Sequence, residues 1–300
     1  MNIVLIHLGD KKINHVTHTL NQLIRYNNKN IYFIAEKKHF PYIKKKIISN
    51  INFIDKSELV PSNMHLLFKE KTRLDKKSLD GFWYNTTERF FYLESFCTKK
   101  KFKNIIHLEN DMLIFDNLSK YIDKFKMNYN IGFTFLNENL CVPGFIYFKN
   151  YKYINLLTKY IYSQNRFFFQ KKNLNDMKLI AKFYNKTNYN KIGLLPTLSE
   201  SIVKELNLTG KNYYTFYKNF KNFKILFDAC ALGQKIDGLD RNFHKHKGSY
   251  INKLNIFNPR NVEIVIKKIK NNKKPFIRLK KVLIPIINIH MHSKRTDYFK

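Results

Sequence analysis

The sequence has little cysteine, glycine, proline or tryptophan. It holds three cysteines, nine glycines, seven prolines and one tryptophan among 300 residues. Cys97, Cys141 and Cys230 lie in apolar contexts and form no C-x-x-C pair. This pattern fits buried thiols in a reducing compartment better than a disulfide framework or a zinc site. No Ser/Gly/Pro-rich linker and no internal repeat divides the chain, so we expect one domain over residues 1–300.

Long apolar runs are also missing. No window approaches the roughly eighteen uninterrupted apolar residues of a membrane-spanning helix. The apolar start from Met1 to Leu8 is stopped by Asp10 and two lysines, which makes it too short for a secretory signal. We therefore predict that this start is a first strand and that the protein is cytoplasmic.

Acidic residues are scarce beside basic ones. Twenty-two Asp and Glu face 55 Lys and Arg, a formal net charge of +33. A polyanionic partner is the first explanation for such a charge. The lysines, however, form short runs along the whole chain, flanked by core-type residues: Lys44–Lys46, Lys99–Lys101, Lys171–Lys172, Lys267–Lys268, Lys273–Lys274 and Lys280–Lys281.

Most of these runs are predicted to be solvated faces. A parallel excess of Asn, Ile, Tyr and Phe indicates that an AT-rich coding sequence inflates the lysine content. Attraction of an anionic substrate and peripheral association with an anionic membrane stay open as uses of the charge. A nucleic-acid partner is not expected.

The apolar content indicates a large core. Hydrophobic residues make up 44% of the chain and aromatic residues 16%, far from the composition of disordered chains. The N-terminal third predicts strands over 3–8, 31–35 and 51–54, alternating with helices over 17–26 and 40–48. Such alternation implies a parallel sheet covered by helices, with ligands bound beyond the carboxyl ends of the strands.

The rest of the chain gives further elements. A helix over 83–98 leads to a strand over 104–108. We then expect an extended segment over 131–135, a hairpin-like segment over 144–148, helices over 154–162 and 175–184, and loops with short helices over 207–260.

The tripeptide Glu109-Asn110-Asp111 ends the strand over 104–108, before an apolar run resumes at Met112. Two carboxylates at i and i+2 share one side of an extended chain, so both can face one ligand. Hard carboxylate oxygens suit Mg²⁺ or Mn²⁺ that also binds substrate phosphates. The pattern therefore predicts a diphosphate holder, and a solvated turn is the alternative.

The run from Ile105 to Leu118 resembles the D-x-D region of GT-A class glycosyltransferases, including an Asp-x-Leu turn at Asp116. Glu109 stands in place of the first Asp. This leaves Asp111 as the metal ligand and Glu109 on either the metal or the nucleotide ribose, with Asn110 between them in the donor site.

The GT-A resemblance implies a fold and a division of labour. The fold is an α/β, GT-A-like single domain with a mixed, mainly parallel sheet flanked by helices and a Rossmann-like N-terminal half. Residues 1–118 would bind the nucleotide sugar and residues 119–300 the acceptor. The donor would be a UDP-sugar in preference to a GDP-sugar.

A second pattern lies near the carboxyl terminus, where an apolar strand over 286–289 is followed by His290, His292 and Lys294. The two histidines point the same way if the strand persists, so they can meet one ion or one phosphate. Many GT-A enzymes are similar, with a late His on the metal and a nearby Lys on the diphosphate. Two surface histidines on an edge strand are the alternative.

Asp176 and Asp228 are the candidate catalytic residues. Asp228 starts an Asp-Ala-Cys-Ala-Leu-Gly-Gln segment similar to one in microbial and viral glycosyltransferases of this type, and Asp176 opens a predicted helix. If the enzyme inverts the anomeric centre, one of them should deprotonate the acceptor hydroxyl. If it retains configuration, no such base is needed. Helix N-capping is the alternative role for each.

Five further residues are weaker candidates. Arg89, one helix before the acidic motif, can match two oxygens of a donor phosphate, unless it is a solvated helical arginine. Trp83 and Tyr84 can stack on a sugar or base, or belong to the core. Asn137 and Glu138 can line the acceptor side.

Taken in order, these blocks predict a metal-dependent, hexosyltransferase-like glycosyltransferase of glycan biosynthesis. It would move a sugar to an acceptor hydroxyl of a glycan, or of a lipid or polysaccharide intermediate. Two alternatives stay open. A nucleotidyltransferase acting on sugar phosphate would be expected to have a Gly-rich loop after the first strand, where residues 8–12 hold one glycine. A non-catalytic nucleic-acid-binding protein would gather lysines and aromatics on one surface.

Overall fold

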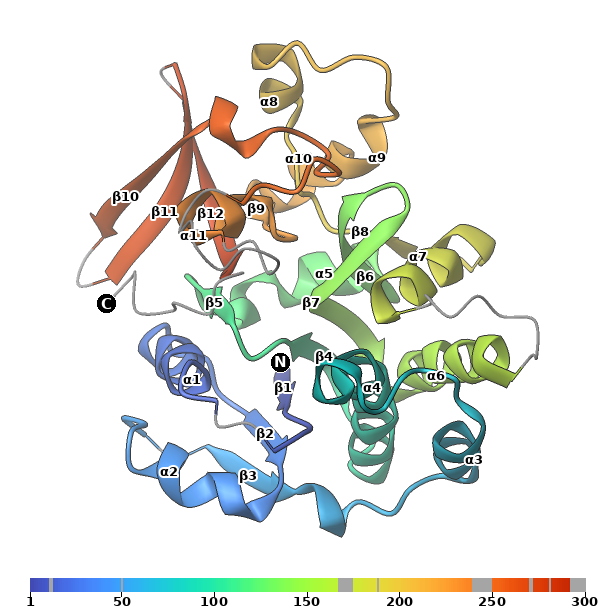
Figure 1. Ribbon diagram of the computed structural model, residues 1–300. Coiled ribbons are helices and arrows are strands. Elements are labelled where there is room, and N and C mark those ends of the chain that lie inside the picture. The colour runs from blue at the N-terminus through green and yellow to red at the C-terminus, as the bar shows by residue number, and fades with distance from the viewer. Residues whose placement is uncertain are drawn as a thin grey trace.

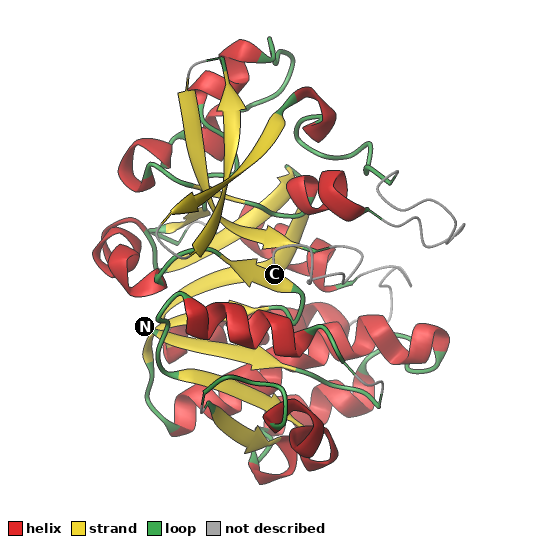
Figure 2. Ribbon diagram, turned by 90° about the vertical axis from the view of Figure 1, so that its left-hand side faces the viewer, coloured by secondary structure: helices red, strands yellow, loops and turns green. Residues whose placement is uncertain are grey.

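Two sheets organise the chain in the computed structural model, which describes residues 1–10, 13–49, 51–166, 175–187, 189–238, 250–269, 272–280 and 282–291. The main sheet has seven strands in the order β3-β2-β1-β4-β7-β6-β8. The second sheet has the order β10-β11-β12-β5, with β9 paired to β12. Helices lie on both faces of the main sheet (Figure 2).

The N-terminal half has the predicted alternation of strands and helices. It comprises β1 (Asn2–Ile6), α1 (Val16–Arg25), β2 (Ile31–Ala35), α2 (Phe40–Lys44) and β3 (Asn52–Asp55). The three strands pair in parallel. The helix expected over 40–48 is shorter than predicted and ends at Lys44. Only Phe40 and Ile43 of α2 are buried.

Alternate residues of β1 serve two cores. Val4 belongs to the cluster that holds the aromatic side chains of α4 (Phe82–Lys99), whereas Ile3 and Leu5 belong to the cluster under α1. Because successive strand side chains point to opposite faces, a strand covered by helices on both sides reads as an unbroken apolar run. This explains why residues 3–6 form an uninterrupted apolar run.

The predicted central strand is confirmed as β4 (Lys103–Leu108), which pairs in parallel with β1 and antiparallel with β7 (Leu140–Asn150). β7 forms a hairpin with β6 (Ile131–Asn137), and β6 pairs in parallel with β8 (Ile192–Leu194). The mixed, mainly parallel sheet flanked by helices is therefore confirmed.

Figure 1 shows where the remaining helices and strands lie. In the described part of residues 207–260, the expected short helices are confirmed. The helices are α3 (Asn63–Lys71), α5 (Ile122–Asn128), α6 (Tyr151–Arg166), α7 (Asp176–Lys186), α8 (Glu200–Glu205), α9 (Tyr214–Tyr217), α10 (Phe220–Phe223) and α11 (Ala231–Asp237). The strands are β5 (Met112–Ile114), β9 (Leu226–Phe227), β10 (Glu263–Ile269), β11 (Asn272–Leu279) and β12 (Val282–His290).

Short 3₁₀ turns connect several of these elements: Lys37–His39, Lys56–Glu58, Ser78–Gly81, Leu118–Tyr121 and Pro259–Asn261. Within the described residues, no helix is both long enough and apolar enough to cross a membrane.

Ile106 offers a test of this core. It is fully buried in β4, so Ile106→Ala should lower the free energy of unfolding by about 2–5 kcal/mol through lost apolar burial and an unfilled cavity. Ile48→Ala removes the same atoms from a side chain that is 64% exposed, and should change stability by less than about 0.5 kcal/mol. Urea titration measures both. Equal effects would contradict the placement of β4 at the centre of the sheet.

Candidate active site

The acidic tripeptide forms the turn between β4 and β5. The Met112 N–H donates to the Glu109 carbonyl at 3.2 Å. The Asn110 amide donates to the Ile6 carbonyl at 3.2 Å, and the Thr19 hydroxyl donates to the Asn110 carbonyl at 2.7 Å. The prediction of an extended chain here is wrong, because this turn closes directly after β4. Its two carboxylates nevertheless converge, and Asn110 fastens the turn to the end of β1.

β12 brings His290 to this turn. It pairs antiparallel with β5, with His290 opposite Met112, and the two strands lie side by side (Figure 1). The His290 Nε2 atom lies 3.2 Å from a Glu109 oxygen and 3.3 Å from an Asp111 oxygen. One ligand atom from each of the three residues lies within 4.8 Å of the others.

The charges of this triad are strongly coupled. Burial disfavours the imidazolium of His290, but the carboxylates of Asp111 and Glu109 outweigh that effect and raise the pKa of His290 to about 9. Two carboxylates and one imidazole form a donor set that could hold a divalent cation such as Mn²⁺.

Two glycines make room for the triad. A Cβ on Gly144 of β7 would lie 2.5 Å from Met112 Cε and 3.1 Å from His290 Nδ1. A Cβ on Gly233 of α11 would lie 1.7 Å from the His290 carbonyl oxygen. The backbones of α11 and β12 therefore approach each other in a way that only glycine permits.

Asp228 holds this approach together. One of its carboxylate oxygens accepts the N–H groups of His290 and Gly233, each at 3.1 Å, and the other accepts the Leu232 N–H at 3.0 Å. The Ala229 carbonyl lies 3.1 Å from His290 Nδ1. An Nδ1–H bond to that carbonyl leaves Nε2 facing the carboxylates.

Asp228 is almost fully buried, and burial raises its pKa. Through these contacts, Asp228 binds two N–H groups in the first turn of α11 and the backbone of His290.

Arg89 of α4 joins Glu109 to Asp176. Its guanidinium lies 2.6 Å from a Glu109 oxygen and 3.0 Å from an Asp176 oxygen. The alternative of a solvated arginine is wrong, because the Arg89 side chain is only 7% exposed. Its Nε atom is buried and has no hydrogen-bond partner among the described residues.

Asp176 opens α7 at the other end of this bridge. Its second oxygen accepts the Met177 N–H at 2.9 Å. Burial raises the pKa of Asp176 to about 6, although the positive charge of Arg89 opposes the rise.

A cavity of about 720 Å³ opens above these groups. Its polar lining includes Arg89, Glu109, Asp111, Asp176 and His290. Apolar side chains also line it: Phe82, Trp83, Leu136, Val142, Pro143 and Met177.

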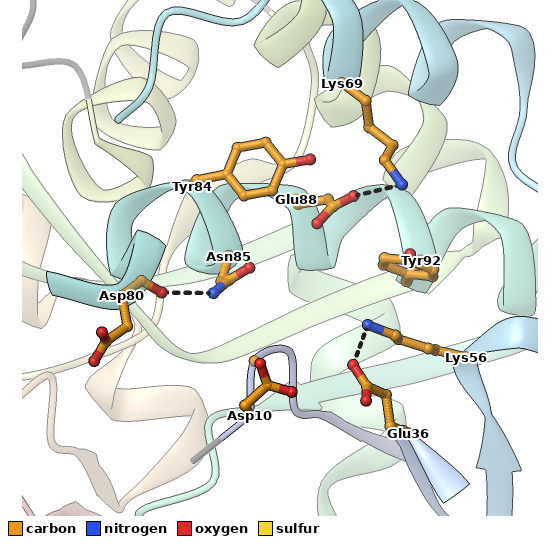
Figure 3. A pocket seen from close by; sticks show the side chains of 10 residues that line it. Asp10, Glu36, Lys56, Lys69, Asp80, Tyr84, Asn85, Glu88 and Tyr92 are labelled. Atoms are coloured by element: carbon orange, nitrogen blue, oxygen red, sulfur yellow. Dashed lines mark hydrogen bonds and ion pairs between the residues drawn. The ribbon is translucent and has the colours of Figure 1, made fainter. Parts of the chain in front are cut away.

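A second pocket of about 570 Å³ shares Gly9, Asp10, Asp80 and Asn85 with this cavity. Tyr84 and Tyr92 line the second pocket beside two ion pairs, Lys56 with Glu36 and Lys69 with Glu88 (Figure 3).

The structure thus brings six of the predicted catalytic, donor-binding and metal-binding residues together on one cavity: Arg89, Glu109, Asn110, Asp111, Asp176 and His290. Of the others, Asp228 lies behind His290, and His292 and Lys294 lie outside the described residues. Asn137 is the last residue of β6, and its side-chain amide donates to the Leu254 carbonyl. Neither it nor Glu138 is among the described residues that line the cavity.

Of the two aromatic candidates, Trp83 lines the cavity, whereas Tyr84 packs in the core beside the second pocket. Sequence reasoning missed His7, which lines the cavity after β1. The position of this polar residue directly after the buried strand β1 is the sequence feature that could have identified it.

No family model and no curated protein matches the sequence. The structure is similar to several solved glycosyltransferases at low identity. The apo form of mouse xyloside xylosyltransferase 1 has a TM-score of 0.44 and 10% identity over 72% of this chain and 93% of that chain. The galactosyltransferase LgtC with donor and acceptor sugar analogs has a TM-score of 0.40 and 14% identity, over 61% of this chain and 70% of that one. The bifunctional glycosyltransferase WbbM has a TM-score of 0.44 and 12% identity, over 74% of this chain and 44% of that one.

Asp228→Asn tests how His290 is held. The new amide nitrogen cannot accept an N–H, so one buried backbone donor loses its partner. We expect the free energy of unfolding to fall by about 1–3 kcal/mol and Mn²⁺ affinity to fall about 10–100-fold. Denaturant titration and calorimetric Mn²⁺ titration measure these changes. Asp123→Asn, at a side chain that is 88% exposed, should alter neither. Unchanged Mn²⁺ affinity in a folded Asp228→Asn protein would show that Asp228 does not position His290.

Proposed function

We propose that the protein is a metal-dependent glycosyltransferase that transfers a sugar from a nucleotide-diphosphate sugar to an acceptor hydroxyl. The observation that carries this proposal is the convergence of Glu109, Asp111 and His290 beside a cavity of about 720 Å³. The cavity lies beyond the carboxyl ends of the parallel strands β1 and β4, where α/β sheets bind ligands. Its volume is in the range of cavities that hold small-molecule ligands.

In this proposal, Glu109, Asp111 and His290 hold Mn²⁺ or Mg²⁺. The bound ion would neutralise charge on the departing nucleoside diphosphate. Asn110 keeps the acidic turn against β1, and Asp228 keeps His290 directed at the two carboxylates. His292 and Lys294, which follow β12, stay predicted contacts of the metal and the diphosphate.

Arg89 would bind the phosphates of the donor. Arg89 lines the cavity, so its guanidinium can offset negative charge on the phosphates of the donor. Glu109 and Asp176 fix the guanidinium in place.

The nucleoside would reach into the second pocket, since the two pockets share the loop at Gly9 and Asp10. The aromatic rings of Tyr84 and Tyr92 offer it apolar surface. A UDP-sugar stays the favoured donor, with GDP-sugars as the alternative.

The acceptor would lie against the apolar part of the cavity, next to Asp176. Of the two predicted catalytic carboxylates, Asp176 is among the described residues that line the cavity and Asp228 is not. We therefore assign Asp176 as the base that takes the proton of the acceptor hydroxyl in an inverting reaction. A hexosyltransferase is the reaction type that we test.

A donor screen tests the proposed function. Purified protein with Mn²⁺ should release nucleoside diphosphate from at least one UDP- or GDP-hexose. Asp111→Asn should lower that turnover by at least about 100-fold, because it removes one charged ligand of the ion. Asp123→Asn is the matched control and should keep wild-type turnover. Release of pyrophosphate from a nucleoside triphosphate, without diphosphate release, would instead support a nucleotidyltransferase.

The pH dependence of turnover tests the role of Asp176. Because the base must be ionised, kcat at saturating Mn²⁺ should rise about tenfold per pH unit below about pH 6 and level off above it. Asp176→Asn should lower kcat by about 100-fold or more and abolish this rise. A variant that keeps both wild-type kcat and the rise near pH 6 would exclude Asp176 as the base.

A further inference from the structure

The hairpin of β10 and β11 concentrates charge that the proposed function does not use. Residues 263–280 contain seven basic residues and one acidic residue. Two lysine runs that are separate in the sequence stand directly opposite each other, with Lys267 opposite Lys274 and Lys268 opposite Lys273. Like charges at directly opposed positions destabilise an antiparallel pair. The hairpin therefore maintains this arrangement at a cost to its own stability.

Only part of this charge is balanced within the protein. Three of the seven basic residues have carboxylate partners: Lys274 pairs with Asp116 at 2.9 Å, Arg278 with Glu263 at 3.1 Å and Lys280 with Glu205 at 3.3 Å. Among the described residues, Lys267 and Lys268 have no carboxylate partner. Their side chains are exposed, as is that of Lys273. The tip of the hairpin, by which we mean Ile266, Lys267, Lys268, Ile269 and Lys273, therefore has a strongly positive surface.

The tip is fixed to the body of the protein. The Tyr26 hydroxyl donates to the Lys273 carbonyl, and the Lys274–Asp116 pair attaches the neighbouring residue. Asp116 follows β5, the strand beside His290. The tip therefore presents its lysines in a set orientation relative to the candidate active site. In Figure 1, β10 lies on the side of the molecule away from α6 and α7.

Exposed isoleucines accompany the lysines. Ile266 is 39% exposed and Ile269 is 42% exposed. Residues alternate between the two faces of a strand, so each face of the tip carries a lysine pair and one of these isoleucines. Lysines mixed with exposed aliphatic side chains suit an interface that offers both phosphate groups and an apolar layer.

Lysines on an edge strand can also serve only to prevent strand pairing with another molecule. That role explains Lys267 and Lys268 on β10, which is the edge strand. It does not explain Lys273 on β11, an inner strand, or the exposed isoleucines. A nucleic-acid surface would use lysines without needing aliphatic contacts.

We propose that the tip of this hairpin, formed by Ile266, Lys267, Lys268, Ile269 and Lys273, docks on the surface of an anionic phospholipid membrane. The lysines contact lipid phosphates, and the two isoleucines enter the boundary between headgroups and acyl chains.

Vesicle binding of the full chain tests this docking. Wild-type protein should bind phosphatidylcholine vesicles that contain phosphatidylglycerol, and should not bind vesicles of phosphatidylcholine alone. Replacing Lys267, Lys268 and Lys273 by Gln should weaken binding about 100-fold, at about fivefold for each lysine. The matched control replaces Lys99, Lys100 and Lys101, which are also exposed, by Gln. It removes the same number of charges as the test variant. It should keep binding within about twofold of wild type, since none of its lysines lies on the hairpin.

A fourth variant, Ile269→Ser, separates lipid from nucleic acid. It should weaken vesicle binding severalfold and leave binding to duplex DNA unchanged. Equal losses in the two triple variants would overturn the proposal in favour of general charge attraction. Failure of wild-type protein to bind anionic vesicles would also overturn it. Duplex DNA binding that depends on the hairpin lysines, with vesicle binding that does not, would assign the surface to nucleic acid. Thermal melting of each variant checks that the fold is kept.

Discussion

The antiparallel pairing of β12 with β5 is the contact on which the candidate site depends. β5 has only three residues, and it follows the acidic turn directly. By pairing with it, β12 places His290 opposite Met112 and within 3.3 Å of Asp111. Without this pairing, the acidic turn would keep its shape, because Asn110 and Thr19 hold it to the N-terminal half. The two carboxylates of the turn would, however, lose their contacts with the His290 imidazole.

The second requirement is charge balance among buried groups. Glu109, Asp111 and Asp176 place three carboxylates in a small volume that is partly shielded from water. Arg89 and His290 offset them, and each cation contacts two of the carboxylates. Removing one member of such a network leaves an uncompensated buried charge, which is strongly destabilising.

Much of the fold could be predicted because its signals are local. Continuous apolar runs identified β1, β2 and β4, and the aromatic pattern after residue 82 identified α4. The acidic motif was visible because two carboxylates follow a buried strand.

The turn that brings the Glu109 and Asp111 side chains together could not be predicted from the local sequence. It is held by contacts with Ile6 and Thr19, which are far away in the chain. The role of Asp228 was hidden for a similar reason. Its partners include the backbone of His290, 62 positions away, and no sequence pattern marks that contact. Gly144 and Gly233 matter through atoms of other elements, which a single sequence does not reveal.

The long separation between β5 and β12 affects how the protein matures during synthesis. Asn288 contacts Met112 across 176 positions of the chain. The strands β1 to β4 can assemble while the ribosome is still translating the second half, but β5 has no neighbour other than β12 in the described sheet. Its backbone groups therefore stay unpaired until β12 emerges. A nascent chain in this state exposes a strand edge that chaperones or other chains can bind. The three residues of the candidate metal site can therefore come together only after β12 has been synthesised.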